Sequence, residues 1–214
     1  MTRQRFVRLV SSPRSSFFTA VVLLIAALFA AAVLAPGAAQ RSSLAGQLLI
    51  AAPTMGDPRF QQTVILLVWH DHTGAMGIVV NRPLRERPLA ALLEALGDKD
   101  AAPAGSVPIF AGGPVQPELC FVLHSAEYRL PVTIDIDGRV ALTSSREILR
   151  DIGNKHGPKH SLIAFGYAGW GPGQLEDELA GRFWFTAPQD AKLVFEADRD
   201  KVWDEAVARR TQEL

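Results

Sequence analysis

Residues 161–180 read SLIAFGYAGWGPGQLEDELA, and this stretch decides the fold prediction. Residues 161–165 form a short apolar run, which predicts a buried strand. Residues 166–173 contain four glycines and a proline, which predict a loop. Residues 174–180 predict a short helix that ends at Gly181. Because a glycine-rich turn between a strand and a helix lets the backbone approach a ligand closely, this loop is the first candidate site.

The rest of the chain alternates irregularly between short apolar runs and a few helical patterns. Further strands are predicted at 46–52, 63–69, 75–80, 107–111, 119–124, 133–136, 140–142, 182–186 and 192–195. Further helices are predicted at 88–96, from a Ser144–Glu147 capping box to about 155, and from about 198 onward. The pattern predicts one α+β domain with a mixed, strongly curved or barrel-like sheet and about four short helices.

A hydrophobic N-terminal extension, residues 1–40, precedes the predicted domain at 41–214. Residues 17–35 are uncharged, and as a helix they would span about 28 Å, close to the thickness of a bilayer. Four arginines come before them, and small residues at 37 and 39, three and one positions before Gln40, suit a signal-peptidase site. The extension is therefore an anchor, a signal peptide or the product of a gene start set too far upstream. If it is translated, the domain is anchored at the inner membrane or exported.

Charge and composition argue against several classes of function. Residues 41–214 carry 18 basic and 22 acidic side chains, a net charge of −4, which disfavours direct nucleic-acid binding. The single cysteine, Cys120, excludes an internal disulfide framework and multi-cysteine metal sites. The glycine-rich loop fits neither phosphate-binding glycine pattern, and acids at 176–178 follow it. No cofactor is predicted.

Proton-transfer chemistry has two candidate residues. His124 ends an apolar run, and Glu178 lies on the predicted helix four residues after Gln174, on the same face. An enzyme could use both as general acid and base, whereas the plainer interpretation is a buried structural histidine and a solvated helix acid. His70 and His72 are two residues apart on a strand end, but two ligands do not make a metal site. No metal site is predicted.

Several segments together resemble the bacterial AlgH/YqgE family. These segments are GQLLIAAPTMGDPRF at 46–60, His70, GAMGIVVNRP at 74–83, GGPV at 112–115, LHS at 123–125 and GYAGWGPGQLE at 166–176. The resemblance covers about residues 44–208. It implies an α+β domain with a barrel-like sheet, a cytoplasmic location and a link to regulation of alginate synthesis, without an established activity.

The sequence leaves three hypotheses for function. The first is a non-enzymatic binding or regulatory domain that recognises a protein or small-molecule partner through its loops. The second is an enzyme that uses His124 and Glu178, and the third is a transcriptional regulator that acts indirectly. The membrane would be a partner only through residues 17–35. The candidate binding residues are Asn81, Arg82, Gly112, Gly113, His124, Tyr167, Trp170, Gln174 and Glu178.

Overall fold

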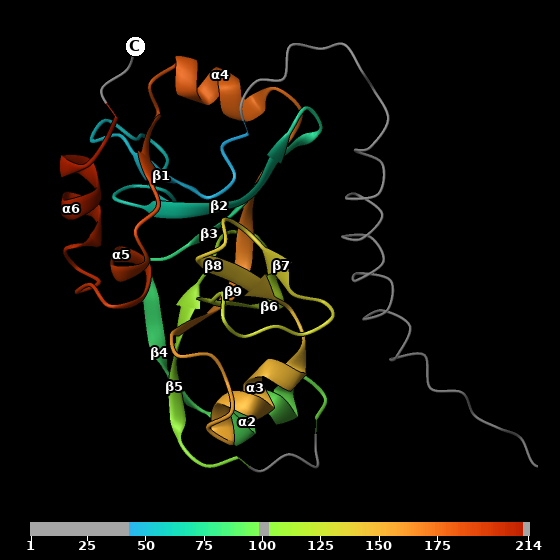
Figure 1. Cartoon of the computed structure of the whole chain (residues 1–214). Coiled ribbons are helices and arrows are strands. Elements are labelled where there is room, and N and C mark those ends of the chain that lie inside the picture. Colours follow the sequence, from blue (N-terminus) through green and yellow to red (C-terminus); the bar gives the residue numbers. More distant parts are fainter. Residues whose placement is uncertain (1–42, 99–102, 212–214) are drawn as a thin grey trace, which may run out of the picture. The chain divides into compact units, whose positions relative to one another are not determined.

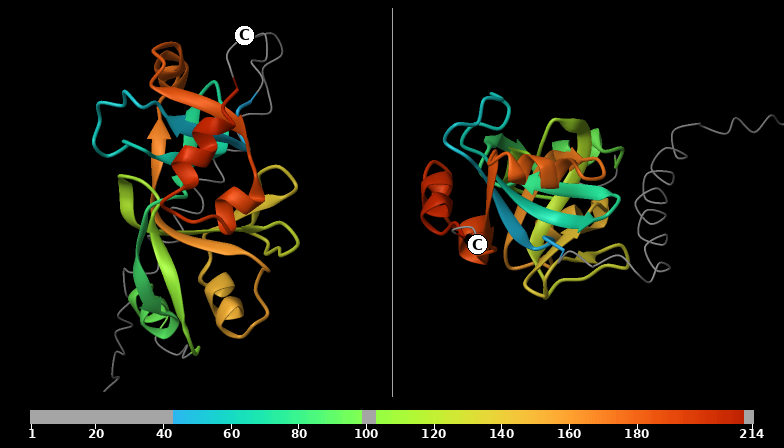
Figure 2. Two further views of the ribbon diagram at one scale, coloured as in Figure 1. Left: turned by 90° about the vertical axis from the view of Figure 1, so that its left-hand side faces the viewer. Right: turned by 90° about the horizontal axis from the view of Figure 1, so that it is seen from above.

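The computed structural model describes residues 43–98 and 103–211, which form an α+β domain built on one curled sheet (Figures 1 and 2). Within these residues, ten strands pair into the sheet. They are β1 (Gln47–Ala51), β2 (Val64–Asp71), β3 (Gly74–Val79), β4 (Pro83–Pro88), β5 (Ser106–Ala111), β6 (Val115–Ser125), β7 (Ile134–Asp135), β8 (Val140–Thr143), β9 (Ser161–Trp170) and β10 (Trp184–Pro188).

Five short helices, one more than predicted, occur in the described part of the chain. They are α2 (Leu89–Ala95), α3 (Arg146–Gly153), α4 (Gln174–Ala180), α5 (Ala191–Phe195) and α6 (Val202–Ala208). Helix α4 has the predicted bounds. Helix α3 is capped by Ser145, whose side chain accepts from the Glu147 N–H. The predicted cap, Ser144, is correct in kind but lies one residue too early.

Strand β9 joins the two halves of the sheet. The strand order is β10-β1-β2-β3-β9-β6-β8-β7, and β5, with β4 beside it, also pairs with β9. Only the β5–β9 pair is parallel among the pairs of the described strands; the others are antiparallel. The sheet is therefore a curled, mainly antiparallel half-barrel, which confirms the predicted α+β class and strong curvature.

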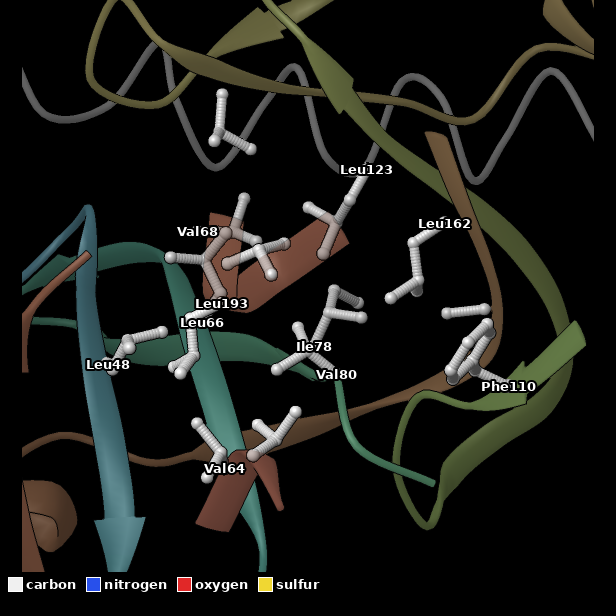
Figure 3. Close-up of a cluster of buried hydrophobic side chains, with 14 of the residues drawn as sticks. Leu48, Val64, Leu66, Val68, Ile78, Val80, Phe110, Leu123, Leu162 and Leu193 are labelled. Carbon is white, nitrogen blue, oxygen red and sulfur yellow. The ribbon is translucent and has the colours of Figure 1, made fainter. Parts of the chain in front are cut away.

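The inside of the half-barrel is filled by a large apolar cluster. Leu66, Ile78 and Leu123 come from three different strands and have almost no exposed surface, and Leu193 of α5 packs on them (Figure 3). A second cluster lies beneath α4 and contains Trp170, Leu175 and Trp184. Burial of these side chains holds the sheet and the helices together.

The glycine-rich segment corrects one prediction. Residues 166–170 were expected in a loop, but they continue β9 to Trp170, which pairs with Ala75 of β3. Gly166 has φ +74°, a left-handed conformation that bends the strand without ending it. Only residues 171–173 form the turn before α4.

Two other elements differ from the predictions. Residues 192–195 were expected as a strand, but they lie in α5, where the side chain of Asp190 accepts from the Lys192 N–H and starts a helix. Strand β4 was not predicted because prolines at both ends and three charged residues between them hide its pattern.

Strand β4 forms a free edge of the sheet among the described strands. Its neighbour β5 contributes Pro108 opposite Glu86, and Pro108 has no N–H, so the backbone groups of Glu86 face away from β5. The two terminal prolines have no N–H, and the register shifts between Pro83 and Arg85. Glu86 still presents its own N–H and C=O outward, but the prolines and the register shift interrupt the row of backbone groups, so the edge is a poor template for another strand.

The predicted hydrophobic extension lies outside the described residues, so the division at residue 40 stays a prediction. Within residues 43–98 and 103–211, no helix is long and apolar enough to cross a bilayer.

Candidate functional site

Three of the predicted residues meet in one hydrogen-bond network at the end of β9. The indole Nε1 of Trp170 donates to Glu178 Oε2 at 2.8 Å, and the Nε1 of Trp184 donates to the same oxygen at 2.8 Å. Gln174 Nε2 donates to the other oxygen, Oε1, at 2.9 Å. One half-buried carboxylate therefore gathers three N–H donors.

The local sequence places each of these groups. Gly173, with φ +76°, begins α4, and the side chain of Gln174 accepts from the backbone N–H of Gly171. Gln174 and Glu178 lie one turn apart on the same face, as their spacing predicted. Leu175 packs into the cluster below, so the polar face of α4 is turned toward Trp170 and Trp184.

The two indoles are themselves largely enclosed. Trp170 is 7% exposed and Trp184 is 2% exposed, and their rings meet edge to face with centroids 6.0 Å apart. Phe60 packs edge-on against Trp184, at 5.5 Å between centroids. The indole N–H groups thus point out of an apolar cluster at a single anionic oxygen, where a hydrogen bond to a charged partner is strong.

Glu178 is the acceptor of this network. Its two oxygens together accept three hydrogen bonds, from Trp170, Trp184 and Gln174. The carboxylate is therefore held by contacts within the domain, and the two indoles supply the donors to one of its oxygens.

His70 ties the start of the domain to α4. Its Nδ1 accepts from the Leu44 N–H at 3.0 Å, so Nε2 carries the proton of the neutral ring and donates to Glu176 Oε1 at 3.2 Å. The ring is buried and contacts α4 rather than His72. No group of three or more potential ligands suited to a metal occurs in the described part of the chain.

Asn81 and Arg82 form a second network, which holds the turn before β2. Asn81 accepts from the Val64 N–H at 2.9 Å and donates to the Gln62 carbonyl at 2.8 Å. Arg82 donates through Nη2 to the Gln61 carbonyl at 2.7 Å and to the Thr63 hydroxyl at 2.9 Å. Their polar groups are therefore used in fixing the backbone of this turn.

Gly112 and Gly113 lie where β5 ends against the bend of β9. A Cβ on Gly113 would stand 2.1 Å from the carbonyl carbon of Tyr167, and one on Gly112 would stand 2.4 Å from the Gly166 oxygen. The Gly112 N–H donates to the Phe165 carbonyl at 2.7 Å. Because glycine has no side chain, the two backbone segments can cross in direct contact. This packing accounts for both glycines, and no ligand is needed to explain their presence.

Tyr167 is half-buried beside this crossing. Its ring packs edge-on against Phe121, with centroids 6.1 Å apart, and burial raises the pKa of its phenol. It borders the large cluster inside the half-barrel, whereas Trp170, three residues later, belongs to the cluster beneath α4. The two aromatic residues of the predicted loop therefore serve different clusters.

His124 lies in a third place and is completely buried. Its Nδ1 lies 3.0 Å from the Ser125 carbonyl, which only accepts, so Nδ1 carries the proton and Nε2 accepts from the Thr143 hydroxyl at 2.9 Å. Burial lowers the pKa of His124 because it disfavours the charged ring.

His124 and Glu178 have separate surroundings in the structure. The hydrogen bonds of His124 lead to Thr143, and those of Glu178 lead to Gln174 and the two indoles, so the two share no partner among the described residues. Trp184 was missed by the sequence prediction because it follows Gly181 in a stretch that reads as an ordinary strand. Trp184 lies 14 residues after Trp170, and this spacing does not predict that both residues bind Glu178.

Comparison with known proteins places the chain in a family. Residues 48–214 match the model of the family described as AlgH-like. The chain belongs to this AlgH-like family. The match confirms the resemblance seen in the sequence motifs, and no specific activity comes with it.

Relatives and solved structures agree with this assignment. A UPF0301 protein of Paracoccus denitrificans is 43% identical over 175 residues, which cover 78% of this chain and 90% of that protein. One of Pseudomonas putida is 49% identical, covering 72% and 82%. The solution structure of the AlgH protein from Pseudomonas aeruginosa, at 40% identity, gives a TM-score of 0.69 and covers 81% of this chain and 92% of that one. A Corynebacterium diphtheriae protein at 21% identity, with a TM-score of 0.59 and coverage of 86% and 93%, shares the fold.

Proposed function

We propose that this AlgH-like protein is a non-enzymatic binding domain with a regulatory role, and that it recognises its partner at the end of β9. The site consists of Trp170, Gln174, Glu178 and Trp184, and we call it the indole–carboxylate site. The observation that carries the proposal is the convergence of two indole N–H groups on one carboxylate oxygen.

The surroundings of the other candidates support binding over catalysis. The hydrogen bonds of Asn81, Arg82 and His124 go to backbone carbonyls and neighbouring hydroxyls of the fold. Gly112 and Gly113 are explained by a backbone crossing. Of the predicted residues, Gln174 and Glu178 form the polar part of the one network that also includes two large aromatic side chains, which are common anchors of recognition sites.

Indole resonances provide a direct test of this function. The full chain, labelled with ¹⁵N, is titrated with an extract of the small molecules and proteins of its own bacterium. The Nε1–H signals of Trp170 and Trp184 are expected to shift on binding. The signal of Trp203, whose Nε1 donates to the Ala51 carbonyl at 2.9 Å and not to Glu178, is the internal comparison.

Two outcomes would contradict the proposal. If only Trp203 or residues far from α4 respond, the binding site lies elsewhere. If the extract contains a substrate that the protein turns over, and turnover is lost in His124→Gln, then the enzyme hypothesis replaces the binding hypothesis.

A further inference from the structure

The indole–carboxylate site has the chemistry of a receptor for an organic anion. Two N–H donors from separate strands, β9 and β10, meet at one oxygen at equal distances of 2.8 Å. Indole nitrogen only donates, so this pair can satisfy an anionic oxygen but has no acceptor to offer a cation. The donors are fixed because both rings are buried in a packed cluster.

In this structure the indole N–H groups bind the carboxylate of Glu178, a side chain that can rotate away from them. Glu178 is half-buried at the surface of a seven-residue helix in which only Leu175 is fully buried. A glutamate side chain has three rotatable bonds, so its carboxylate can turn into water without moving the helix. The two indole N–H groups would then face the space that it leaves.

Two half-buried apolar side chains border the cluster that holds the indoles, and they indicate the kind of ligand that would suit it. Half-buried Phe60 and Leu179 pack against the same cluster, and Phe60 touches the ring of Trp184 edge-on. A ligand with a carboxylate for the indoles and an apolar body for these side chains matches both features. A free inorganic anion could accept the hydrogen bonds of the indoles but would make no favourable contact with the apolar side chains.

We propose that the indole pair binds the carboxylate of an apolar organic acid, and that Glu178 is an internal stand-in for this ligand that occupies the site in the free protein. This inference rests on the proposed function and names its ligand class. Ligand binding then requires displacement of Glu178, so the protein's own side chain sets the affinity by competition.

Removal of the competitor tests the inference. Benzoate is titrated into the full chain and into Glu178→Ala while the Nε1–H signals of Trp170 and Trp184 are followed. Glu178→Ala is expected to bind benzoate at least about tenfold more tightly than the wild type, because the internal carboxylate no longer competes. Benzamide, which has the same shape without the charge, is expected to gain no comparable affinity.

A second variant covers the case in which the alanine protein does not fold. Glu178→Gln keeps the side-chain size and a weaker, neutral acceptor, so its benzoate affinity is expected to lie between those of the wild type and Glu178→Ala. The same benzoate affinity in every folded variant, or shifts confined to Trp203, would overturn the inference. If an extract component shifts Trp170 and Trp184 while benzoate does not bind more tightly to the variants, the site stands and the displacement mechanism falls.

Discussion

At the scale of single residues, Glu178 and His124 have different surroundings. Glu178 accepts hydrogen bonds from two indole N–H groups, and His124 is enclosed where its charged form is disfavoured. Both groups are satisfied by hydrogen bonds. Their roles in stability can therefore be separated by substitution and by pH.

Replacement of Glu178 is expected to destabilise the fold. Glu178→Ala leaves two enclosed indole N–H groups without their charged acceptor, and a hydrogen bond to a charged group contributes about 1.5–3 kcal/mol. We expect the free energy of unfolding, measured with urea, to fall by about that amount. Asp177→Ala, at an exposed position on the same helix, is the control and should change it by less than about 1 kcal/mol. Equal losses would show that the indole contacts are not responsible.

His124 is expected to make the stability of the protein depend on pH. Its pKa in the folded protein is lowered from 6.5, so below about pH 6.5 the unfolded chain binds a proton that the folded protein does not. The free energy of unfolding should therefore decrease as the pH falls below about 6.5 and be unaffected by this group above it. Urea unfolding of the wild type and of His124→Gln at several pH values measures the difference, with exposed His72→Gln as the control. An identical pH dependence in His124→Gln and wild type would contradict the assignment.

At the scale of elements, β9 organises the domain because it changes neighbours at Gly166. Before this residue β9 pairs with β5, and after it β9 pairs with β3, while β6 runs along its other side. A bend in the left-handed region and a crossing with Gly113 are both needed at this point. The glycines quoted from the sequence are therefore structural determinants of the sheet.

A matched pair of glycine substitutions tests this role. Gly166 and Gly138 have nearly the same φ, +74° and +77°, but a Cβ on Gly166 would stand 2.4 Å from the Gly113 oxygen, whereas one on Gly138 would meet nothing within 4 Å. Gly138→Ala should cost about 1–2 kcal/mol for the backbone conformation alone. Gly166→Ala should cost about 1–3 kcal/mol more because of the added clash. Thermal or urea unfolding compares the two, and equal costs would exclude the crossing as the cause.

The elements that the sequence predicted well are those with local signals. Helix α4 has glycines at both ends and was predicted with its observed bounds. The failures have physical reasons. The apolar residues 193–195, which follow Lys192, suit a strand as well as a helix, and the capping contact of Asp190 decides between them. The run at 166–170 reads as a loop because glycine has low strand propensity, yet residues 168–170 pair with β3 and so continue the strand. The meeting of Trp170 with Trp184 depends on tertiary packing, which no spacing in the sequence expresses.

At the scale of the whole molecule, the shared strand makes the two halves of the sheet depend on each other. Trp170 and Trp184 lie in the half formed by β10, β1, β2 and β3 with the end of β9, and Cys120 lies in β6 of the other half. Loss of β9 removes the pairing partner of both halves. We therefore expect one cooperative unfolding transition for the domain.

Cys120 allows that expectation to be measured. Burial raises the pKa of its thiol to about 12, so the folded protein holds little reactive thiolate at neutral pH. Labelling of Cys120 by a thiol reagent should begin at the same urea concentration at which tryptophan fluorescence changes. Labelling that clearly precedes the fluorescence change would show that the β6 half opens alone. Cys120→Ala, followed by fluorescence only, controls for effects of the reagent.

The prolines and charges of the β4 edge affect how readily molecules of this protein can stack on one another at high concentration. A half-barrel, unlike a closed barrel, keeps an outer strand, and such rims are where chains stack into fibrils. Here the strand has prolines at positions 83 and 88 and charged side chains between them. An incoming strand would therefore find few backbone groups with which to form hydrogen bonds. At high protein concentration, the β4 edge should consequently contribute little to amyloid-type stacking.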